Sequence, residues 1–253
     1  LHETLITEAL SARLAELPGE LVASGELASA EAADRLALHI GSEVERAIRG
    51  LPEGDRVRVG VQVVRMLLDQ LGEQIDDDLP PGRPVEGGRV LHGVFRRNPD
   101  GTADRVPSPI TPLLDTTLLT NAHGEPSMWG QLGSEIESAD GIDVVMAFIR
   151  RSGIGPLIER LRRHCASGKP LRVLTTVYTD STEPEALQQL VDLGADVRVS
   201  YDVGTTRLHA KAWVFHRGSG FSTAFVGSSN LTHSAQVTGI EWNVRASAAR
   251  NRD

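Results

Sequence analysis

The residues best suited to chemistry lie in one stretch, between Arg207 and Asn243. His209 and Lys211 stand two positions apart in an alternating run, so a strand there would place the imidazole and the ammonium on one face, roughly 6–7 Å apart. A neutral imidazole can attack phosphorus, and a lysine can offset the charge of an oxyanion. The pair therefore points to the chemistry of phosphate esters.

A hairpin after this pair would carry two more hydrogen-bonding groups to it. Residues 217–220, Arg-Gly-Ser-Gly, predict a turn, and the run 221–226 predicts a second strand that returns beside the first. That strand leads into Gly-Ser-Ser-Asn, which contains Ser228 and Asn230. We therefore expect Ser228 and Asn230 near the face that carries His209.

Glu241, on a further segment with apolar neighbours, can accept a hydrogen bond from the second nitrogen of His209 and fix its tautomer. Taken alone, a His-x-Lys is usually a surface pair, Gly-Ser-Ser-Asn a turn, and a glutamate a solvated carboxylate. Their order and spacing together favour an active site. His216 and His233 are interpreted as structural or surface groups, with His233 near enough in sequence to line the site. Cys165, the single cysteine, is interpreted as an ordinary buried thiol.

In this order the residues resemble the signature of the phospholipase D superfamily, which is His-x-Lys, four residues, Asp, and then Gly-Ser-x-Asn. The matching positions are His209, Lys211, Gly227, Ser228 and Asn230. Glu241 resembles the orienting glutamate of the smaller nuclease members of that family. The chain departs from the pattern at His216, which stands where the family has Asp, and in a longer segment before Gly227.

The resemblance implies a reaction with two histidines, one that forms a phosphohistidine and one that protonates the leaving oxygen and later activates water. This chain has one His-x-Lys, so it is expected to form a homodimer in which both subunits share one active site. Lys211, Ser228 and Asn230 would then hold phosphate oxygens. Glu241 would orient His209. No metal or other cofactor is implied for this domain.

The first part of the chain, 1–75, predicts a small helical region. Apolar residues recur there with helical spacing, and Pro52-Glu-Gly-Asp interrupts the pattern. The expected helices span 4–17, 30–51 and 56–71. We interpret the region as a bundle or cap, a candidate for docking or dimerisation without chemistry of its own.

Residues 76–109 are predicted to form a connector. Asp76-Asp77-Asp78 before a proline-rich turn is typical of a solvated charge run, and its spacing disfavours a metal site. Residues 91–96 predict a short strand, and Asn98-Pro-Asp-Gly predicts a turn.

From about residue 110 to 253 the pattern alternates between strands and helices, as in βαβ units on a mostly parallel or mixed sheet. The expected strands are 118–120, 141–148, 171–177 and 195–200, and the expected helices are 127–138, 155–165 and 184–193. This order also resembles one phospholipase D half. The predicted fold class is therefore α/β, a phospholipase D-like mixed sheet flanked by helices and preceded by the helical region.

Two polar clusters in this domain have competing explanations. Thr175, Thr176, Tyr178, Thr179, Asp180 and Ser181 follow a strand, where open α/β sheets bind ligands, although a loop with a helix cap is the favoured interpretation. The basic cluster consists of Arg150, Arg151, Arg160, Arg162, Arg163, Lys169 and Arg172. It is either a phosphate-binding patch, with Arg150, Arg151, Arg163 and Lys169 as candidate nucleic-acid contacts, or an ordinary solvated helix face.

The charge of the chain is unevenly distributed. Its net charge is −8, but residues 1–80 hold 7 Lys and Arg against 16 Asp and Glu, whereas the remainder holds 19 against 18. The acidity therefore belongs to the helical region and does not exclude a nucleic-acid substrate. One cysteine, no apolar run near about 18 residues and no signal-like start predict a cytoplasmic protein without a membrane span.

The substrate predicted for this chain is nucleic acid, more specifically DNA. The segments after Lys211 resemble the phospholipase D-like module at the N-terminus of bacterial superfamily 2 helicases, several of which act in DNA processing or phage defence. The chain starts with Leu and stops at Asn-Arg-Asp, as expected of a piece of such a protein. Any ATP would serve a motor outside this chain, because no P-loop is present. The alternatives are a catalytically weak nucleic-acid-binding or dimerisation platform and, less favoured, a lipid phosphodiesterase.

Overall fold

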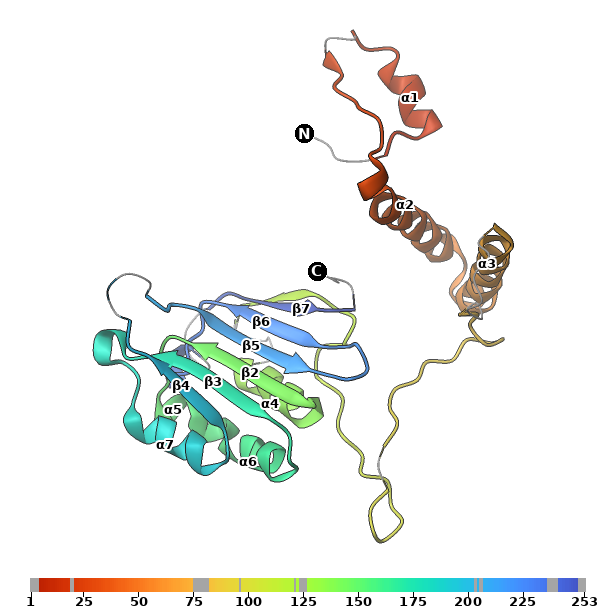
Figure 1. Cartoon of the computed structure of the whole chain (residues 1–253). Helices are drawn as coiled ribbons and strands as arrows, with labels where there is room; N and C mark the ends of the chain where they lie inside the picture. The colour runs from red at the N-terminus through yellow and green to blue at the C-terminus, as the bar shows by residue number, and fades with distance from the viewer. Residues whose placement is uncertain are drawn as a thin grey trace. The chain divides into compact units, whose positions relative to one another are not determined.

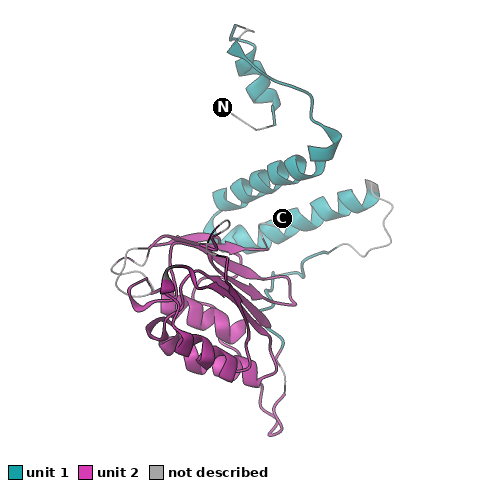
Figure 2. Ribbon diagram, turned by 60° about the vertical axis from the view of Figure 1, so that its left-hand side comes forward, with its two compact units in different colours: residues 1–94 teal, residues 95–253 magenta. Residues whose placement is uncertain are grey.

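The computed structural model describes residues 5–18, 21–74, 82–95, 97–120, 122, 127–202, 204, 207–235 and 241–249. The chain divides into two compact units, Leu1–Val94 and Phe95–Asp253 (Figure 2). The division falls within the connector predicted for 76–109. Asp76-Asp77-Asp78 lies outside the described residues.

The first unit contains the predicted helices α1 (Glu8–Leu14), α2 (Ser29–Gly50) and α3 (Glu53–Gln74). Helix α1 is shorter than expected because Thr7 caps it, accepting a hydrogen bond from the backbone N–H of Leu10 at 3.2 Å. The described helices enclose no apolar core, since Gly60 is the one buried residue among the described part of this unit. The bundle expected here is therefore not closed.

The predicted strand at 91–96 is wrong for its described residues, 91–95, which are not paired with any strand. Leu91 and Val94 are 80% and 87% exposed, as expected of a segment that is not packed in a sheet. The turn after it is confirmed: the N–H of Gly101 donates to the carbonyl of Asn98 at 2.9 Å.

The second unit is an α/β domain built on a mixed sheet (Figure 1). Its strands are β1 (Thr117–Leu119), β2 (Gly141–Met146), β3 (Leu171–Thr176), β4 (Asp196–Ser200), β5 (Lys211–His216), β6 (Thr223–Gly227) and β7 (Asn243–Ser247). Its helices are α4 (Met128–Ser138), α5 (Arg151–Ile154), α6 (Ile158–Ala166) and α7 (Pro184–Asp192), with 3-10 turns η2 (Gly155–Leu157) and η3 (Tyr178–Asp180). The predicted alternation of strands and helices is confirmed.

The seven strands lie in the order β1-β7-β6-β5-β2-β3-β4. Strands β2, β3 and β4 are parallel, and the remaining pairs are antiparallel, so the predicted mixed sheet is confirmed. Helices α4, α5, α6 and α7 cover one face of the sheet (Figure 1). The core between them is aliphatic and aromatic, with Leu132 and Ile136 of α4 packed with Phe215 and Phe225 of the hairpin. None of the helices in the described part of the chain combines the length and the apolar character of a membrane span.

The register brings one end of each of the seven strands to the same edge of the sheet. Met146 at the end of β2 pairs with Lys211 at the start of β5, and Gly227 at the end of β6 pairs with Asn243 at the start of β7. Strands β3 and β4 end at the same level, as the pairing between their last residues shows. We call this the site edge: the edge at which β1, β2, β3, β4 and β6 end and β5 and β7 begin.

A buried ionic network ties α4 to the sheet. The carboxylate of Glu135 accepts from Arg217 Nη2 at 2.5 Å, from Arg245 Nε at 2.8 Å and from Thr223 Oγ1 at 2.8 Å. Glu135 and Arg245 have no exposed side-chain surface. Arg245 Nη1 also donates to the carbonyls of Pro112 and Asp115, at 2.9 and 2.7 Å. One carboxylate thus holds the hairpin, β7 and the segment before β1 together.

Candidate active site

His209 and Lys211 meet at the start of β5. The strand begins at Lys211, so His209 precedes it and is exposed at the site edge. Lys211 Nζ lies 2.9 Å from Nδ1 and 3.2 Å from Nε2 of His209, and it donates to the His209 carbonyl at 2.9 Å. The His209 ring packs edge-on against Phe148, with centroids 5.8 Å apart. The two residues are therefore in direct contact, closer than strand spacing alone predicts.

The surroundings of Lys211 affect its pKa. An ammonium group offers only donors, so a ring nitrogen of His209 that bonds to it must accept and carry a lone pair. Burial lowers the pKa of Lys211 below the usual value of a lysine, and the nearby Glu241 carboxylate opposes that shift. Lys211 is thus held directly beside the ring of the candidate nucleophile.

Ser228 is fixed by the residues that precede β7. Its N–H donates to the Trp242 carbonyl at 3.0 Å, and its Oγ accepts from the Trp242 N–H at 3.1 Å. The hydroxyl in turn donates to the carboxylate of Glu241. Gly227 permits this close approach, because a Cβ at that position would overlap the Trp242 carbonyl. The close approach of the 227–228 and 242–243 backbones thus accounts for the glycine at 227, and Ser228 bonds to the same neighbouring segment.

Asn230 is carried to the site by backbone bonds to the end of β2. The N–H of Leu231 donates to the Phe148 carbonyl at 3.1 Å, and the N–H of Arg150 donates to the Leu231 carbonyl at 2.9 Å. Gly153 on α5 packs so closely on this loop that a Cβ there would overlap the Leu231 carbonyl. Asn230 therefore sits beside Phe148, the residue that also contacts the His209 ring.

Glu241 has a different partner from the one expected. The hydrogen bond that the structure gives its carboxylate comes from Ser228 Oγ, and its electrostatic influence falls on Lys211. Among the described contacts, His209 bonds to Lys211 and packs on Phe148. Among the described contacts, Glu241 therefore does not touch His209, the residue that it was expected to orient. Its carboxylate is instead bonded to the Ser228 hydroxyl.

His216, at the position of the family Asp, lies at the far end of β5 from Lys211. Its Nε2 is 2.8 Å from Oδ2 of Asp143, on the neighbouring β2. Arg172 holds the same carboxylate through two bonds of 2.5 and 2.6 Å. Burial disfavours ionisation of Asp143, but the hydrogen bonds from Arg172 and His216 outweigh it and keep its pKa below the ordinary value. A carboxylate from β2 thus lies beside this position, in a structural cluster.

The other predicted structural groups have partners of their own. The ring of His233 packs edge-on against Trp129, with centroids 5.4 Å apart. Cys165 is partly buried on α6, and burial raises the pKa of its thiol. Neither residue contacts the His209 and Lys211 pair among the described interactions.

The basic residues proposed to bind nucleic acid fall into two places. Arg150 and Arg151 follow β2 at the site edge, where Arg150 Nε donates to the Ser181 carbonyl at 3.3 Å. Arg163 and Lys169 precede β3 and lie at the opposite edge of the sheet. Lys169 donates to the Ala139 carbonyl at 2.7 Å, and Arg163 bonds to Glu137 at 3.2 Å. The structure therefore does not bring the four residues into one patch.

The polar cluster after β3 contains a contact that sequence reasoning missed. Thr176 Oγ1 donates to the Ser200 carbonyl at 3.1 Å and accepts from the N–H of Tyr178 at 3.2 Å, which fixes the turn. The Arg207 guanidinium lies over the Tyr178 ring, 5.1 Å from its centroid, and Nη1 donates to the tyrosine hydroxyl at 3.1 Å. Arg207 lies two residues before His209 in the same alternating run, and this position was the signal in the sequence that could have placed its side chain near the site.

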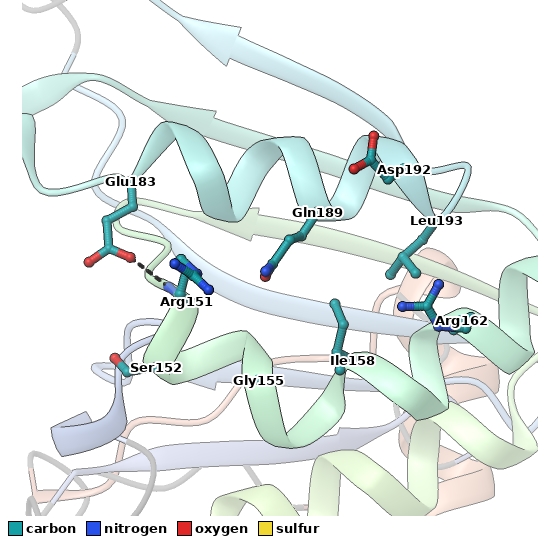
Figure 3. Close-up of a pocket in the computed structure, with 9 residues that line it drawn as sticks. All are labelled: Arg151, Ser152, Gly155, Ile158, Arg162, Glu183, Gln189, Asp192 and Leu193. Atoms are coloured by element: carbon teal, nitrogen blue, oxygen red, sulfur yellow. Dashed lines mark hydrogen bonds between the residues drawn. The ribbon is translucent and has the colours of Figure 1, made fainter.

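A groove of about 760 Å³ lies between α5 and α6 on one side and α7 on the other (Figure 3). Its lining has both charges, with Arg151 and Arg162 facing Glu183 and Asp192. The Glu183 carboxylate accepts from the backbone N–H of Arg151 at 2.8 Å. The groove does not include His209 or Lys211. Among the described residues, no three His, Cys, Asp or Glu side chains gather as metal ligands would.

No family model and no curated protein matches the chain. Several solved structures are similar to it. NucT from Helicobacter pylori has a TM-score of 0.41 at 14% identity, over 52% of this chain and 84% of that one. Nuc from Salmonella typhimurium, a phospholipase D family member, has a TM-score of 0.40 at 17% identity, over 52% of this chain and 82% of that one. A polyphosphate kinase from Porphyromonas gingivalis has a TM-score of 0.39 at 15% identity, over 56% and 27%.

The second of these structures comes from the family that the motifs resemble. At such identities and TM-scores the likeness concerns the fold over about half of the chain and does not bear on its activity.

Proposed function

We propose that this chain is a phosphodiesterase of the phospholipase D type, and specifically a nuclease that cleaves DNA through a phosphohistidine without a metal ion. The observation that supports it most strongly is the direct contact between Lys211 Nζ and the His209 ring, at 2.9 Å. Ser228, Asn230 and Glu241 share the site edge with that pair. A nucleophile, a cation and neutral donors are thus available at one place, as phosphoryl transfer requires.

In the first step, a ring nitrogen of His209 attacks phosphorus and the bond to the leaving oxygen breaks. Lys211 turns its ammonium from the imidazole to a phosphate oxygen and offsets the charge that develops there. The hydroxyl of Ser228 turns from the Glu241 carboxylate to donate to another of the phosphate oxygens, as does the side-chain amide of Asn230. The leaving oxygen takes a proton from the imidazolium of a second histidine.

That second histidine is supplied by a second copy of the chain, because the sequence holds one His-x-Lys. In the second step, it accepts a proton from water, and the oxygen of that water attacks phosphorus. The phosphorus–nitrogen bond breaks, which restores neutral His209 and releases a phosphate monoester. The second histidine thereby returns to its imidazolium form, so the cycle consumes the diester and water and no other reactant.

The choice of DNA and the attachment to a helicase motor rest on the sequence resemblance to helicase-linked modules. A role in DNA processing or phage defence belongs to the same proposal. The acidic first unit does not oppose it, since residues 81–253 hold 19 basic against 18 acidic side chains.

The decisive experiment incubates the full chain with labelled single- and double-stranded DNA in excess EDTA, beside vesicles of phosphatidylcholine. We expect cleavage of DNA that persists in the chelator, and no release of headgroup. Turnover of the lipid alone would replace the nuclease by a lipid phosphodiesterase. Binding of DNA without cleavage would instead support a platform for an attached motor.

The Glu241 carboxylate is expected to set the alkaline limit of activity. Lys211 works as an ammonium, so activity falls as pH rises through its pKa. Removing the negative charge in Glu241→Gln removes the effect that opposes the lowering by burial, so the pKa of Lys211 falls further. The alkaline limb of kcat/KM should therefore move to lower pH, in profiles measured from about pH 7 to 10.5.

Asp202→Asn is the matched control for this profile. Asp202 is another carboxylate at the site edge, where it accepts from the N–H of Gly204 at 3.1 Å through an oxygen that asparagine keeps. Its replacement should leave the alkaline limb in place. An unmoved limb in Glu241→Gln would show that Lys211 does not set it.

A further inference from the structure

Two exposed aromatic side chains, Tyr201 and Trp242, lie at the site edge together with the half-buried Tyr178. The chain has two tyrosines and three tryptophans. Tyr178 follows β3, Tyr201 follows β4, and Trp242 precedes β7. Tyr201 is 75% exposed and Trp242 63% exposed, whereas Trp213 is buried in the core. Large aromatic surfaces left in water at one edge of a sheet indicate a ligand that covers them.

These aromatic residues flank the catalytic groups on both sides. Trp242 is bonded through its backbone to Ser228, at 3.0 and 3.1 Å. On the other side, Tyr178 carries the guanidinium of Arg207, two residues before His209. From the strand order, the row from Tyr201 to Trp242 crosses five strand spacings, about 24 Å. A substrate with its phosphate at His209 must be a polymer to reach all of them.

The charges along this edge are balanced. The described segments next to the strand ends hold four basic side chains, Arg150, Arg151, Arg207 and Lys211, against four acidic ones, Asp180, Glu183, Asp202 and Glu241. A duplex presents one negative charge per about 1.7 Å of axis and buries its bases, so it gains little from such an edge. A single strand exposes its bases, and stacking on aromatic rings does not depend on net charge.

We infer that the site edge binds single-stranded nucleic acid, with bases stacked on Tyr201, Trp242 and the Arg207–Tyr178 pair while one phosphate sits at His209. This inference rests on the proposed nuclease function and names the form of its substrate. The stacking positions lie on both sides of His209, so they hold the strand upstream and downstream of the cleaved bond.

Binding is measured first, in His209→Ala protein so that nothing is cut, with labelled single strands and duplexes of the same sequence. We expect the single strand to bind more tightly than the duplex. Tyr201→Ala and Trp242→Ala should each weaken single-strand binding about 5- to 100-fold, the range given by loss of one stacked base. Duplex binding should change less than about twofold, because a duplex has no free base to stack. Tyr201→Phe keeps the ring and should bind like its parent.

Phe221→Ala is the matched control. Phe221 is also exposed, at 37%, but lies on the β5–β6 turn at the opposite edge, and its bond to Arg217 uses the backbone carbonyl. Its loss should leave binding unchanged. Equal binding of single strands and duplexes, with no effect of the aromatic variants, would overturn the inference. So would a change of oligomeric state without a change in binding, since the aromatics would then form a protein interface.

Turnover separates this inference from the proposed function. The KM for single strands should rise in Tyr201→Ala and Trp242→Ala, whereas Phe221→Ala should keep both that KM and its kcat on bis(4-nitrophenyl) phosphate. If every variant cleaves the duplex as well as the single strand, the inferred stacking of bases is wrong and the proposed nuclease function stands. If neither DNA nor the small diester is hydrolysed, the proposed function itself fails.

Discussion

Replacing His209 with alanine is expected to abolish cleavage, lowering kcat/KM by on the order of 10⁴- to 10⁶-fold, the loss typical of a missing nucleophile. Without the imidazole no phosphohistidine can form, and a shared site loses its acid and base as well. His209 is exposed, so the variant should keep its melting temperature. Single-turnover assays with labelled DNA, beside a thermal melt, measure both quantities. A variant that retains more than about one-tenth of the activity would exclude His209 as the nucleophile.

The same variant tests the shared site. If each active site needs His209 from both subunits, a mixed dimer is inactive, and activity follows the square of the wild-type fraction. After subunit exchange, equal mixing should leave about one quarter of the activity, not one half. Phe221→Ala protein mixed in the same way should cause no loss. A linear decrease with His209→Ala would mean that one chain contains a complete site.

Replacing Glu135 with glutamine is expected to cost about 3–5 kcal/mol of folding free energy, because it leaves two arginines buried without a counter-charge. Arg245 is fully buried and Arg217 nearly so, and both bond to this carboxylate. Such a loss is a large part of the about 5–15 kcal/mol that stabilises a typical domain. It should lower the melting temperature by about 6–20 °C, as scanning calorimetry can measure.

Glu137→Gln is the control within the same helix. Glu137 pairs with Arg160 at 2.9 Å and Arg163 at 3.2 Å, and the arginine side chains are 41% and 69% exposed. An exposed pair contributes about 0–1 kcal/mol, so this variant should melt close to wild type. If the two glutamine variants melt alike, the network around Glu135 contributes no more than a surface pair.

The sequence by itself determined the local features of this protein. A continuous apolar run predicted strand β2, and alternation of side chains predicted strand β5, because the pleat sends successive side chains to opposite faces. The turn at Asn98 to Gly101 follows from residues next to one another in the chain. The order of His209, Lys211, Ser228 and Asn230 was enough to predict a phosphate-type site, since short hairpins bring such spacings together.

Only the tertiary structure decided which distant groups meet. The partner of Glu241, the carboxylate of Asp143 beside His216, and the separation of Arg163 from Arg150 all depend on strand order and register. The segment 91–95 has a strand-like sequence but no neighbouring strand to pair with. Charges and aromatic rings carry no periodic signal, so their positions follow from the pairing of segments far apart in sequence. That pairing alone gathers Tyr178, Tyr201 and Trp242 at the edge that holds His209.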